Sequence, residues 1–232
     1  MIRMSLPLLM AMLALGTGTS TASEESVDRA TKSALALDAH PKSGALLYAR
    51  NCQSCHGEKA GGDPARNIPT LAGQRFTYLV RQMADFAGRE RDSREMHQAL
   101  SGAELKIPQA WVDIAAWLSA LPMTPVVQNG DGKHLGLGEG IFREQCASCH
   151  REDARGDDDG YVPSLRGQHQ GYLASQIHGL ANGRRHNLDE NLMRFFNSFE
   201  DPDIAAVADY LSRLKGAGQS RQKMRDDGTV VD

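Results

Sequence analysis

The chain has 232 residues, with 26 lysines and arginines against 29 aspartates and glutamates, which gives a formal net charge of −3. A mildly acidic chain has no basic stripe to neutralise phosphates, so the composition argues against nucleic acid as a partner. Beyond the N-terminus, no segment of the sequence is long and apolar enough to span a membrane.

The N-terminus has the pattern of an export signal. Arg3 precedes an apolar run from Leu6 to Leu15, and small residues follow up to Ala22. This order is typical of a secretory signal peptide, and the run is shorter than the roughly 20 residues of a membrane-spanning helix. We therefore expect cleavage near Ala22 and a mature protein located in the periplasm.

Two pentapeptides contain all four cysteines of the chain. Cys-Gln-Ser-Cys-His occupies residues 52–56, and Cys-Ala-Ser-Cys-His occupies residues 146–150. Cys-x-x-Cys-His is the attachment signature of c-type haem. Residues three and four apart share one face of a short helix, so both thiols and the histidine can reach one porphyrin. The motifs predict two covalently bound haem c groups, attached through Cys52, Cys55, Cys146 and Cys149, with His56 and His150 as axial iron ligands.

Two other interpretations of the cysteines remain open at this point. Exported chains with an even number of cysteines often form disulfides, and paired Cys-x-x-Cys units also occur in zinc sites. Neither interpretation explains the histidine that follows each pair, and the pairs are separated by most of a domain. The haem signature is the stronger interpretation.

The chain is an internal duplication. Cys52 recurs as Cys146 after 94 residues, and the segment Ile-Pro-Thr-Leu-Ala-Gly-Gln recurs as Val-Pro-Ser-Leu-Arg-Gly-Gln at the same offset. A Tyr-Leu pair follows in each copy, and a one-residue slip then aligns Gly88-Arg89 with Gly183-Arg184. Each copy has about 80 residues, too few for a generous core, and a haem would supply the missing apolar centre.

The hydrophobic periodicity within each copy is helical. Apolar residues three and four apart predict helices over 76–86 and 172–180, closed by stop signals at Gly88 and Gly183, and final helices over 111–121 and 204–214. We expect an all-α fold of two tandem cytochrome c domains. The expected division is a signal peptide (1–22), a leader (23–41), an N-terminal domain (42–122), a linker (123–137), a C-terminal domain (138–216) and a mobile tail (217–232).

The second axial ligand decides whether each iron is closed to substrates. Met96 lies 40 residues beyond His56, and Met193 lies 43 residues beyond His150, so the two methionines are the predicted ligands. Histidine ligation would lower the reduction potential. The histidines that compete with this assignment are His97 in the first copy and His169, His178 and His186 in the second.

Further residues are candidates for contacts around each haem. Pro69 and Pro163 each lie 13 residues beyond the motif histidine, where the backbone can accept that histidine's other ring proton. Polar side chains that could bind the haem propionates are Gln74, Gln168, Tyr78, Tyr172, Arg89 and Arg184. The acidic segment 152–160 lacks the last glutamate of an EF-hand loop, so we expect a solvated loop, with calcium binding or docking of a basic partner as alternatives.

The two haem motifs, the Pro-x-Leu-x-Gly-Gln element, the Tyr-Leu helix ending in Gly-Arg and the late methionine of each half resemble the cytochrome c4 family of dihaem cytochromes. The resemblance covers about residues 43–215. It implies two domains packed about a pseudo-twofold axis, His/Met ligation of both irons and electron delivery toward a terminal oxidase or similar acceptor. His97 departs from the family, in which a second methionine often follows the ligand.

The motifs indicate an electron carrier and not an enzyme. Its partners would be redox proteins, a donor and an acceptor such as a membrane oxidase or dehydrogenase, and no small-molecule substrate is expected. A dihaem enzyme of the peroxidase or thiosulfate-oxidising type is one alternative, although no cysteine is left over for thiolate ligation. A cytochrome subunit of a larger dehydrogenase is another.

Overall fold

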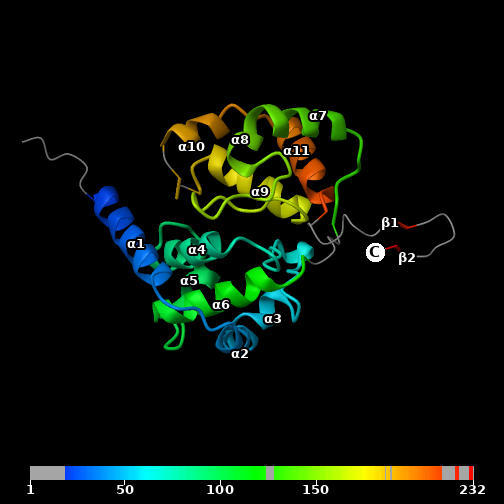
Figure 1. The fold of residues 1–232 in the computed structure, drawn as a ribbon. Coiled ribbons are helices and arrows are strands. Elements are labelled where there is room, and N and C mark those ends of the chain that lie inside the picture. Colours follow the sequence, from blue (N-terminus) through cyan, green and yellow to red (C-terminus); the bar gives the residue numbers. More distant parts are fainter. Residues whose placement is uncertain are drawn as a thin grey trace, which may run out of the picture.

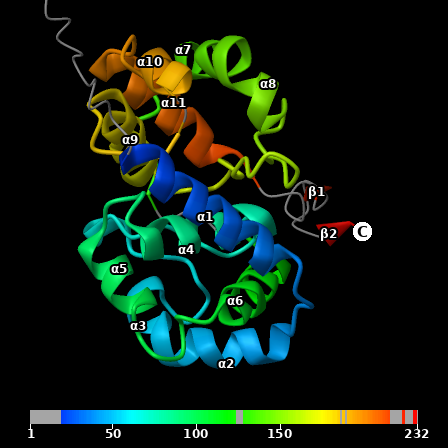
Figure 2. The same cartoon turned by 90° about the vertical axis from the view of Figure 1, so that its left-hand side faces the viewer.

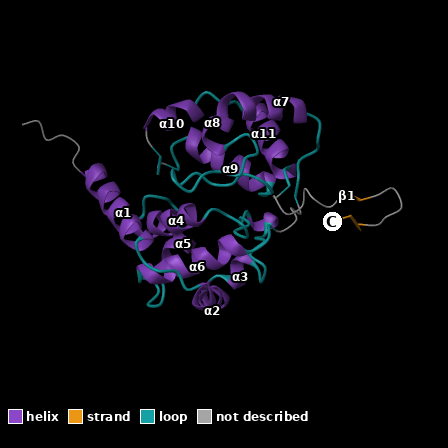
Figure 3. Ribbon diagram, viewed as in Figure 1, coloured by secondary structure: helices purple, strands orange, loops and turns teal. Residues whose placement is uncertain are grey.

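The computed structural model describes residues 19–123, 128–185, 187–188, 190–215, 223–224 and 230–231. Most of the expected signal peptide and of the expected tail lies outside these residues. The described part forms two helical lobes, one above the other in Figure 1, with the helices joined by irregular loops (Figure 3). The all-α fold expected from the sequence is confirmed.

The lower lobe holds the first copy of the duplication and the upper lobe the second. The first copy consists of α2 (Pro41–Asn51), α3 (Gln53–His56), the 3₁₀ turn η1 (Pro64–Arg66), α4 (Phe76–Gly88), α5 (Arg94–Leu100) and α6 (Pro108–Ala120). The second consists of α7 (Leu135–Ile141), the π-helical turn η2 (Phe142–Cys146), α8 (Ala147–His150), α9 (Gln170–Ala181), α10 (Glu190–Phe196) and α11 (Asp201–Arg213). Two-residue strands β1 (Lys223–Met224) and β2 (Val230–Val231) pair antiparallel outside both lobes.

Each lobe is organised by one close helix crossing. A Cβ atom on Gly44 of α2 would come within 1.9 Å of the Asp113 carbonyl oxygen in α6, and one on Gly138 of α7 within 2.1 Å of the Ala206 oxygen in α11. Only glycine permits two backbones to approach so closely. The crossing fixes the helix that leads into each Cys-x-x-Cys-His motif against the last helix of its domain.

An additional helix, α1 (Thr19–Leu35), packs against α4 and α6 of the first copy and occupies most of the expected leader. Figure 2 shows it lying across that lobe. Its inner face buries Val27, Thr31 and Ala34, and Arg81 of α4 joins Asp28 to Asp85 at 2.5 and 2.8 Å. The helix is therefore an integral part of the first domain. None of the described helices is long and apolar enough to cross a membrane.

α4 ends at Gly88, where the stop signal was expected, but this glycine is not the residue that leaves the helix. Gly88 is helical, and its missing side chain makes room for Val27, whose Cγ2 would lie 2.5 Å from a Cβ there. The residue that leaves the helix in the left-handed conformation is Arg89 (φ 65°), and its counterpart is Gly183 (φ 72°). These two are 94 residues apart, so the duplication runs through this point without the one-residue slip.

The crossing predicts opposite effects for two alanine substitutions on one helix. Gly138→Ala should lower the free energy of unfolding by about 1–3 kcal/mol because the added methyl overlaps the α11 backbone. Gly140→Ala, where no atom lies within 4 Å, should leave it unchanged or raise it by up to about 1 kcal/mol. Denaturant titration of the haem-loaded protein measures both, and equal values for the two variants would contradict the crossing.

Candidate haem sites and the domain interface

Both Cys-x-x-Cys-His motifs end in a single helical turn, α3 and α8. In each motif the first cysteine is partly buried, the second is exposed, and all four thiols are unpaired. Burial, with the neighbouring thiol, raises the pKa of Cys52 to about 12 and that of Cys146 to about 11. Zinc binds cysteine as thiolate, which these surroundings disfavour, whereas a thioether to haem carries no charge.

The motif histidines are held by backbone carbonyls at the positions proposed from the sequence. His56 Nδ1 lies 3.3 Å from the Pro69 oxygen, and His150 Nδ1 lies 3.0 Å from the Pro163 oxygen. Burial lowers the pKa of both imidazoles, which keeps them neutral. With Nδ1 donating to a carbonyl, Nε2 is left as the metal-binding nitrogen, and such a bond also fixes the ring orientation.

A glycine in each copy allows the proline carbonyl to reach the ring. Gly62 (φ 74°) and Gly156 (φ 73°) pass so close to the proline segment that a Cβ would lie 2.5 Å from the carbonyl oxygen of Pro69 or Pro163. Each glycine N–H also donates to the carbonyl of its motif histidine at 2.9 Å. The loop after the motif is therefore closed around the histidine, and only glycine can occupy this position in it.

Partly buried apolar side chains surround each motif and fit the remaining requirements of a haem. In the first domain the core is bordered by Cys52, Leu71, Phe76 and Met96, and in the second by Cys146, Leu165, Ile177 and Phe199. Two thiols, a neutral imidazole with a free nitrogen and an apolar wall are the groups that a covalent haem needs. The residues present in both domains fit a haem c group.

In the first domain, the structure separates Met96 from its neighbour His97. Both residues belong to α5, a helix not predicted from the sequence, which begins at the cap Ser93. Met96 packs against the apolar core, whereas His97 Nδ1 lies 3.0 Å from the Phe86 carbonyl oxygen. The methionine is therefore available to a group inside the domain, and the histidine is held at the end of α4.

In the second domain, Met193 is partly buried on α10, which packs against α9. It borders an open cavity of about 520 Å³ together with Gly183 and Arg194. His169 is buried at the domain interface, with Nε2 2.9 Å from the Gly61 carbonyl oxygen, and His178 faces Asp201 at 3.7 Å. The remaining candidate, His186, lies outside the described residues.

The two glutamines considered for propionate binding join the two domains. Gln74 donates to the Ser164 carbonyl at 3.0 Å and accepts from its N–H at 2.7 Å. Gln168 does the same with Thr70, at 2.9 and 3.0 Å. Gln168 lies 94 residues after Gln74, and Ser164 lies 94 residues after Thr70, so each domain makes the same contact to the other. Such reciprocal contacts are the property of a twofold axis.

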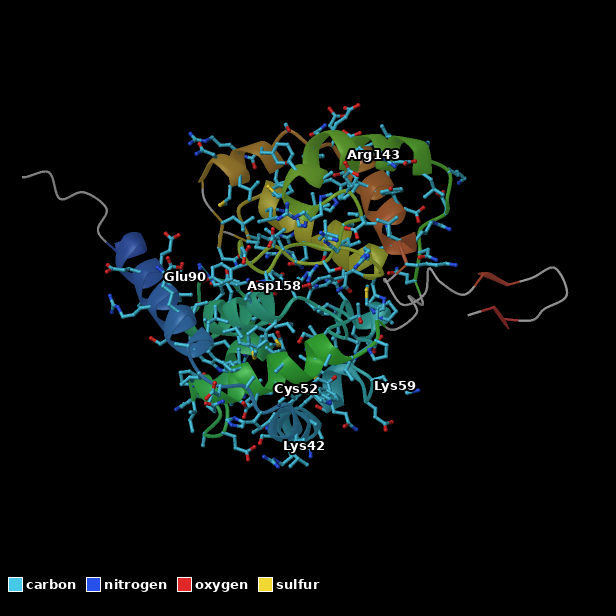
Figure 4. The ribbon with its side chains drawn as sticks, viewed as in Figure 1. Lys42, Cys52, Lys59, Glu90, Arg143 and Asp158 are labelled. Carbon is cyan, nitrogen blue, oxygen red and sulfur yellow. The ribbon has the colours of Figure 1, made fainter. Side chains whose placement is uncertain are left out.

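The acidic segment 152–160 also takes part in this interface. Asp158 lies between the lobes (Figure 4), where it accepts from the Thr77 hydroxyl and N–H at 3.2 Å and from Arg75 at 3.2 Å. Arg75 Nε donates to the Arg155 carbonyl at 2.7 Å. The expectation of a solvated loop is wrong for Asp158, which binds the start of α4 in its own chain.

At the other end of the interface, Arg91 and Tyr78 of the first domain meet the residues at the equivalent positions of the second, Arg185 and Tyr172. Arg91 donates to the Tyr172 hydroxyl at 2.7 Å and to Gln176 at 2.6 Å, and Arg185 donates to Gln176 at 3.2 Å. Burial alone would raise the pKa of Tyr78, but Arg185 and Arg91 outweigh it and lower that pKa. The cluster therefore carries a positive potential.

Sequence reasoning missed both of these arginines. The slipped alignment favoured Arg89 and Arg184, which are exposed, and among the described residues Arg184 bonds to the nearby Asn182. Arg89 and Gly183, the two residues in the left-handed conformation, show that the offset of 94 residues continues past the helix. At this offset Arg91 and Arg185 are equivalent. An unbroken offset was the signal that could have found them.

Two helical domains, each presenting a haem attachment turn and a carbonyl-held histidine, define the class of dihaem c-type cytochromes. Family models agree with this class: that of cytochrome c matches residues 136–215, and that of cytochrome c oxidase, cbb3-type, subunit III, matches residues 39–116. The chain is an electron-transfer protein with two covalently bound haem c groups.

Known relatives define the family. Cytochrome c4 of Pseudomonas aeruginosa is 33% identical over 173 residues, which is 70% of this chain and 83% of the relative. The thiosulfate dehydrogenase electron acceptor of Stutzerimonas stutzeri is 30% identical over 78% of this chain and 87% of its own length. The crystal structure of reduced cytochrome c4 from Pseudomonas stutzeri superposes with a TM-score of 0.69 at 28% identity, covering 76% of this chain and all of that one. The chain belongs to the cytochrome c4 family.

The reciprocal glutamine contacts predict a local effect of substitution. Gln168→Ala removes the hydrogen bond that the buried Thr70 N–H donates to Gln168, at a cost of about 1–3 kcal/mol, so hydrogen exchange at the Thr70 amide should accelerate. The exposed Gln98→Ala provides a control, in which the Thr70 amide should exchange as in the unmodified protein. An unchanged exchange rate at the Thr70 amide in Gln168→Ala would show that the bond to Gln168 does not protect this amide.

Proposed function

We propose that the chain is a periplasmic electron carrier that passes single electrons between redox proteins, toward a terminal oxidase or a similar acceptor. Each bound haem supplies one-electron exchange between ferric and ferrous iron. The observation that carries the proposal is the same in both domains. All cysteines belong to attachment motifs, and the histidine of each motif has a candidate methionine in its own domain. A closed iron of this kind transfers electrons and binds no substrate.

The axial ligands in this proposal are His56 with Met96 and His150 with Met193. Met96 is supported by its position against the core and by the separate anchoring of His97. Met193 is supported by its place on α10, the counterpart of α5, while His169 is held at the Gly61 carbonyl across the interface. The carbonyls of Pro69 and Pro163 act by orienting the histidine rings, which strengthens their donation to the metal.

The ligand assignment is tested by the near-infrared methionine-to-iron(III) band. Met96→Ala and Met193→Ala should each remove about half of its intensity, because each leaves one iron without sulfur. Met83→Leu, a buried core substitution on α4, and His97→Ala should retain the full band. A full band in Met193→Ala would refute the assignment in the second domain.

Two of the matches support a direction of electron flow. The first domain matches the model of a cbb3-type oxidase subunit, and one relative is named as the electron acceptor of thiosulfate dehydrogenase. We infer that an acceptor of the oxidase type and a donor of the dehydrogenase type both dock on this chain. Such redox encounters have small, transient interfaces.

A thiosulfate-oxidising enzyme is the second candidate, favoured by a structural similarity to thiosulfate dehydrogenase from Marichromatium purpuratum, which superposes with a TM-score of 0.65 at 25% identity over 43% of that chain. The two functions differ in a simple assay. The oxidised carrier should stay oxidised in thiosulfate alone and become reduced only when a thiosulfate dehydrogenase is added, because its irons have no open coordination position. Reduction by thiosulfate without the dehydrogenase, measured from the haem absorbance, would favour the enzyme.

Export is tested separately. If the signal peptide is removed near Ala22, the mass of the periplasmic protein should equal that of residues 23–232 plus two haems. A mass equal to the bare polypeptide would contradict covalent attachment.

A further inference from the structure

The two domains exchange a second pair of equivalent contacts, which reaches the loops that hold the haem-binding histidines. Arg75 Nε donates to the Arg155 carbonyl oxygen at 2.7 Å, and His169 Nε2 lies 2.9 Å from the Gly61 carbonyl oxygen. His169 follows Arg75 by 94 residues, and Arg155 follows Gly61 by the same number. The contact therefore crosses the interface in both directions, from the residue that precedes α4 or α9 to the loop of the opposite domain.

In the first domain, the accepting carbonyl belongs to a peptide group whose N–H is also bonded. The Gly61 carbonyl shares its peptide with the Gly62 N–H, which donates to the His56 carbonyl at 2.9 Å. Hydrogen bonds on the two sides of one peptide polarise each other, so a donor at the carbonyl strengthens the bond that the N–H makes. His169 thus acts through a single peptide on the backbone of the haem-binding histidine of the other domain.

The second domain has the same arrangement. The Arg155 carbonyl shares its peptide with the Gly156 N–H, which donates to the His150 carbonyl at 2.9 Å. Gly156 also lies against the Pro163 carbonyl that holds the His150 ring. Arg75 of the first domain therefore acts on the closed loop around His150.

The two donors differ in strength. Arg75 is a permanent cation that also donates to the Gly156 carbonyl at 3.4 Å and to Asp158 at 3.2 Å. His169 is only 2% exposed, burial lowers its pKa, and among the described residues its Nδ1 has no hydrogen-bond partner. A hydrogen bond from a charged donor is roughly twice as strong as one between neutral groups.

The bonds that fix the two histidine rings follow the same order. His150 Nδ1, in the loop with the charged donor, lies 3.0 Å from the Pro163 oxygen. His56 Nδ1, in the loop with the neutral donor, lies 3.3 Å from the Pro69 oxygen. The more firmly held loop thus has the shorter bond to its ring.

We propose that Arg75 and His169 are positioning residues that act across the interface, each setting how firmly the opposite domain holds its haem-binding histidine. The inference rests on the proposed electron-carrier function and extends it. A stronger bond from the ring to its carbonyl makes the imidazole a better donor, which stabilises ferric iron and lowers the reduction potential. Each domain therefore helps to set the potential of its neighbour.

The contact is tested by hydrogen exchange of the Gly62 and Gly156 amides in the reduced, haem-loaded protein. In His169→Phe, which removes the donor, the Gly62 amide should exchange roughly two- to tenfold faster, the range for loss of one neutral hydrogen bond. The Gly156 amide should keep its rate. Arg75→Met should give the reverse, with faster exchange at Gly156 and none of this effect at Gly62.

Three comparisons separate positioning from a general loosening of the interface. His169→Gln, whose amide can donate to the same carbonyl, should return Gly62 close to its unmodified rate and remains informative if His169→Phe folds poorly. His178→Phe, a matched change within α9, should alter neither glycine. The Thr70 amide, which donates to Gln168 across the same interface, should keep its rate in His169→Phe. Acceleration at Gly62 and Thr70 together, or at neither, would overturn the proposal.

The effect on potential is measured at about pH 8, where a histidine of lowered pKa is neutral and its replacement removes no charge. In Met193→Ala the remaining methionine band belongs to the first haem, so its loss on reduction gives the midpoint of that haem. Adding His169→Phe should raise this midpoint, with a roughly two- to tenfold change in the oxidised-to-reduced ratio. In Met96→Ala, where the band reports on the second haem, His169→Phe should leave the midpoint unchanged.

A shift of both midpoints, or of neither, would contradict the cross-domain effect. Amide exchange does not depend on which residue ligates the iron. A failure of the methionine bands would therefore count against the proposed function and would leave the exchange comparison as the test of this inference.

Discussion

The close crossing of the first and last helices of each domain is the constraint on which the other features depend. Gly44 and Gly138 allow α2 and α7 to lie directly on the backbones of α6 and α11. Each crossing is reinforced by an aromatic pair, Tyr48 with Trp117 and Phe142 with Tyr210. Because the attachment turn follows the crossing helix directly, its cysteines and histidine are positioned by the crossing. The loop after each motif then supplies the proline carbonyl, and the short helices α5 and α10 carry the candidate methionines.

The interface repeats the glutamine contacts about the twofold axis, but other contacts differ between the two halves. Arg75 reaches the Arg155 carbonyl, and at the equivalent position His169 reaches the Gly61 carbonyl. Burial lowers the pKa of His169, so one domain contributes a permanent charge where the other contributes a largely neutral ring. The two haems thus sit in similar folds with different electrostatic surroundings, which is a physical basis for unequal potentials.

The sequence predicted what depends on local pattern and missed what depends on contacts across the fold. The haem motifs and long amphipathic helices such as α4 were found because their spacing is set by helix geometry. Helices α5 and α10 have seven residues each, too few for a periodic signal. The paired arginines were missed because a Gly-Arg dipeptide occurs in both copies at different structural positions. No local pattern indicates that Gln74 and Gln168 bind the opposite domain.

The reciprocal glutamine pairs have a consequence for how the two halves are joined. Contacts exchanged symmetrically between two copies are those of an isologous homodimer, so the surfaces themselves specify the geometry of assembly. The connecting peptide need only keep the halves at high effective concentration, and a chain fused in this way can let its two sequences diverge independently. Covalent linkage thereby permits what a dimer of identical subunits does not: two surfaces of different sequence within a single twofold framework.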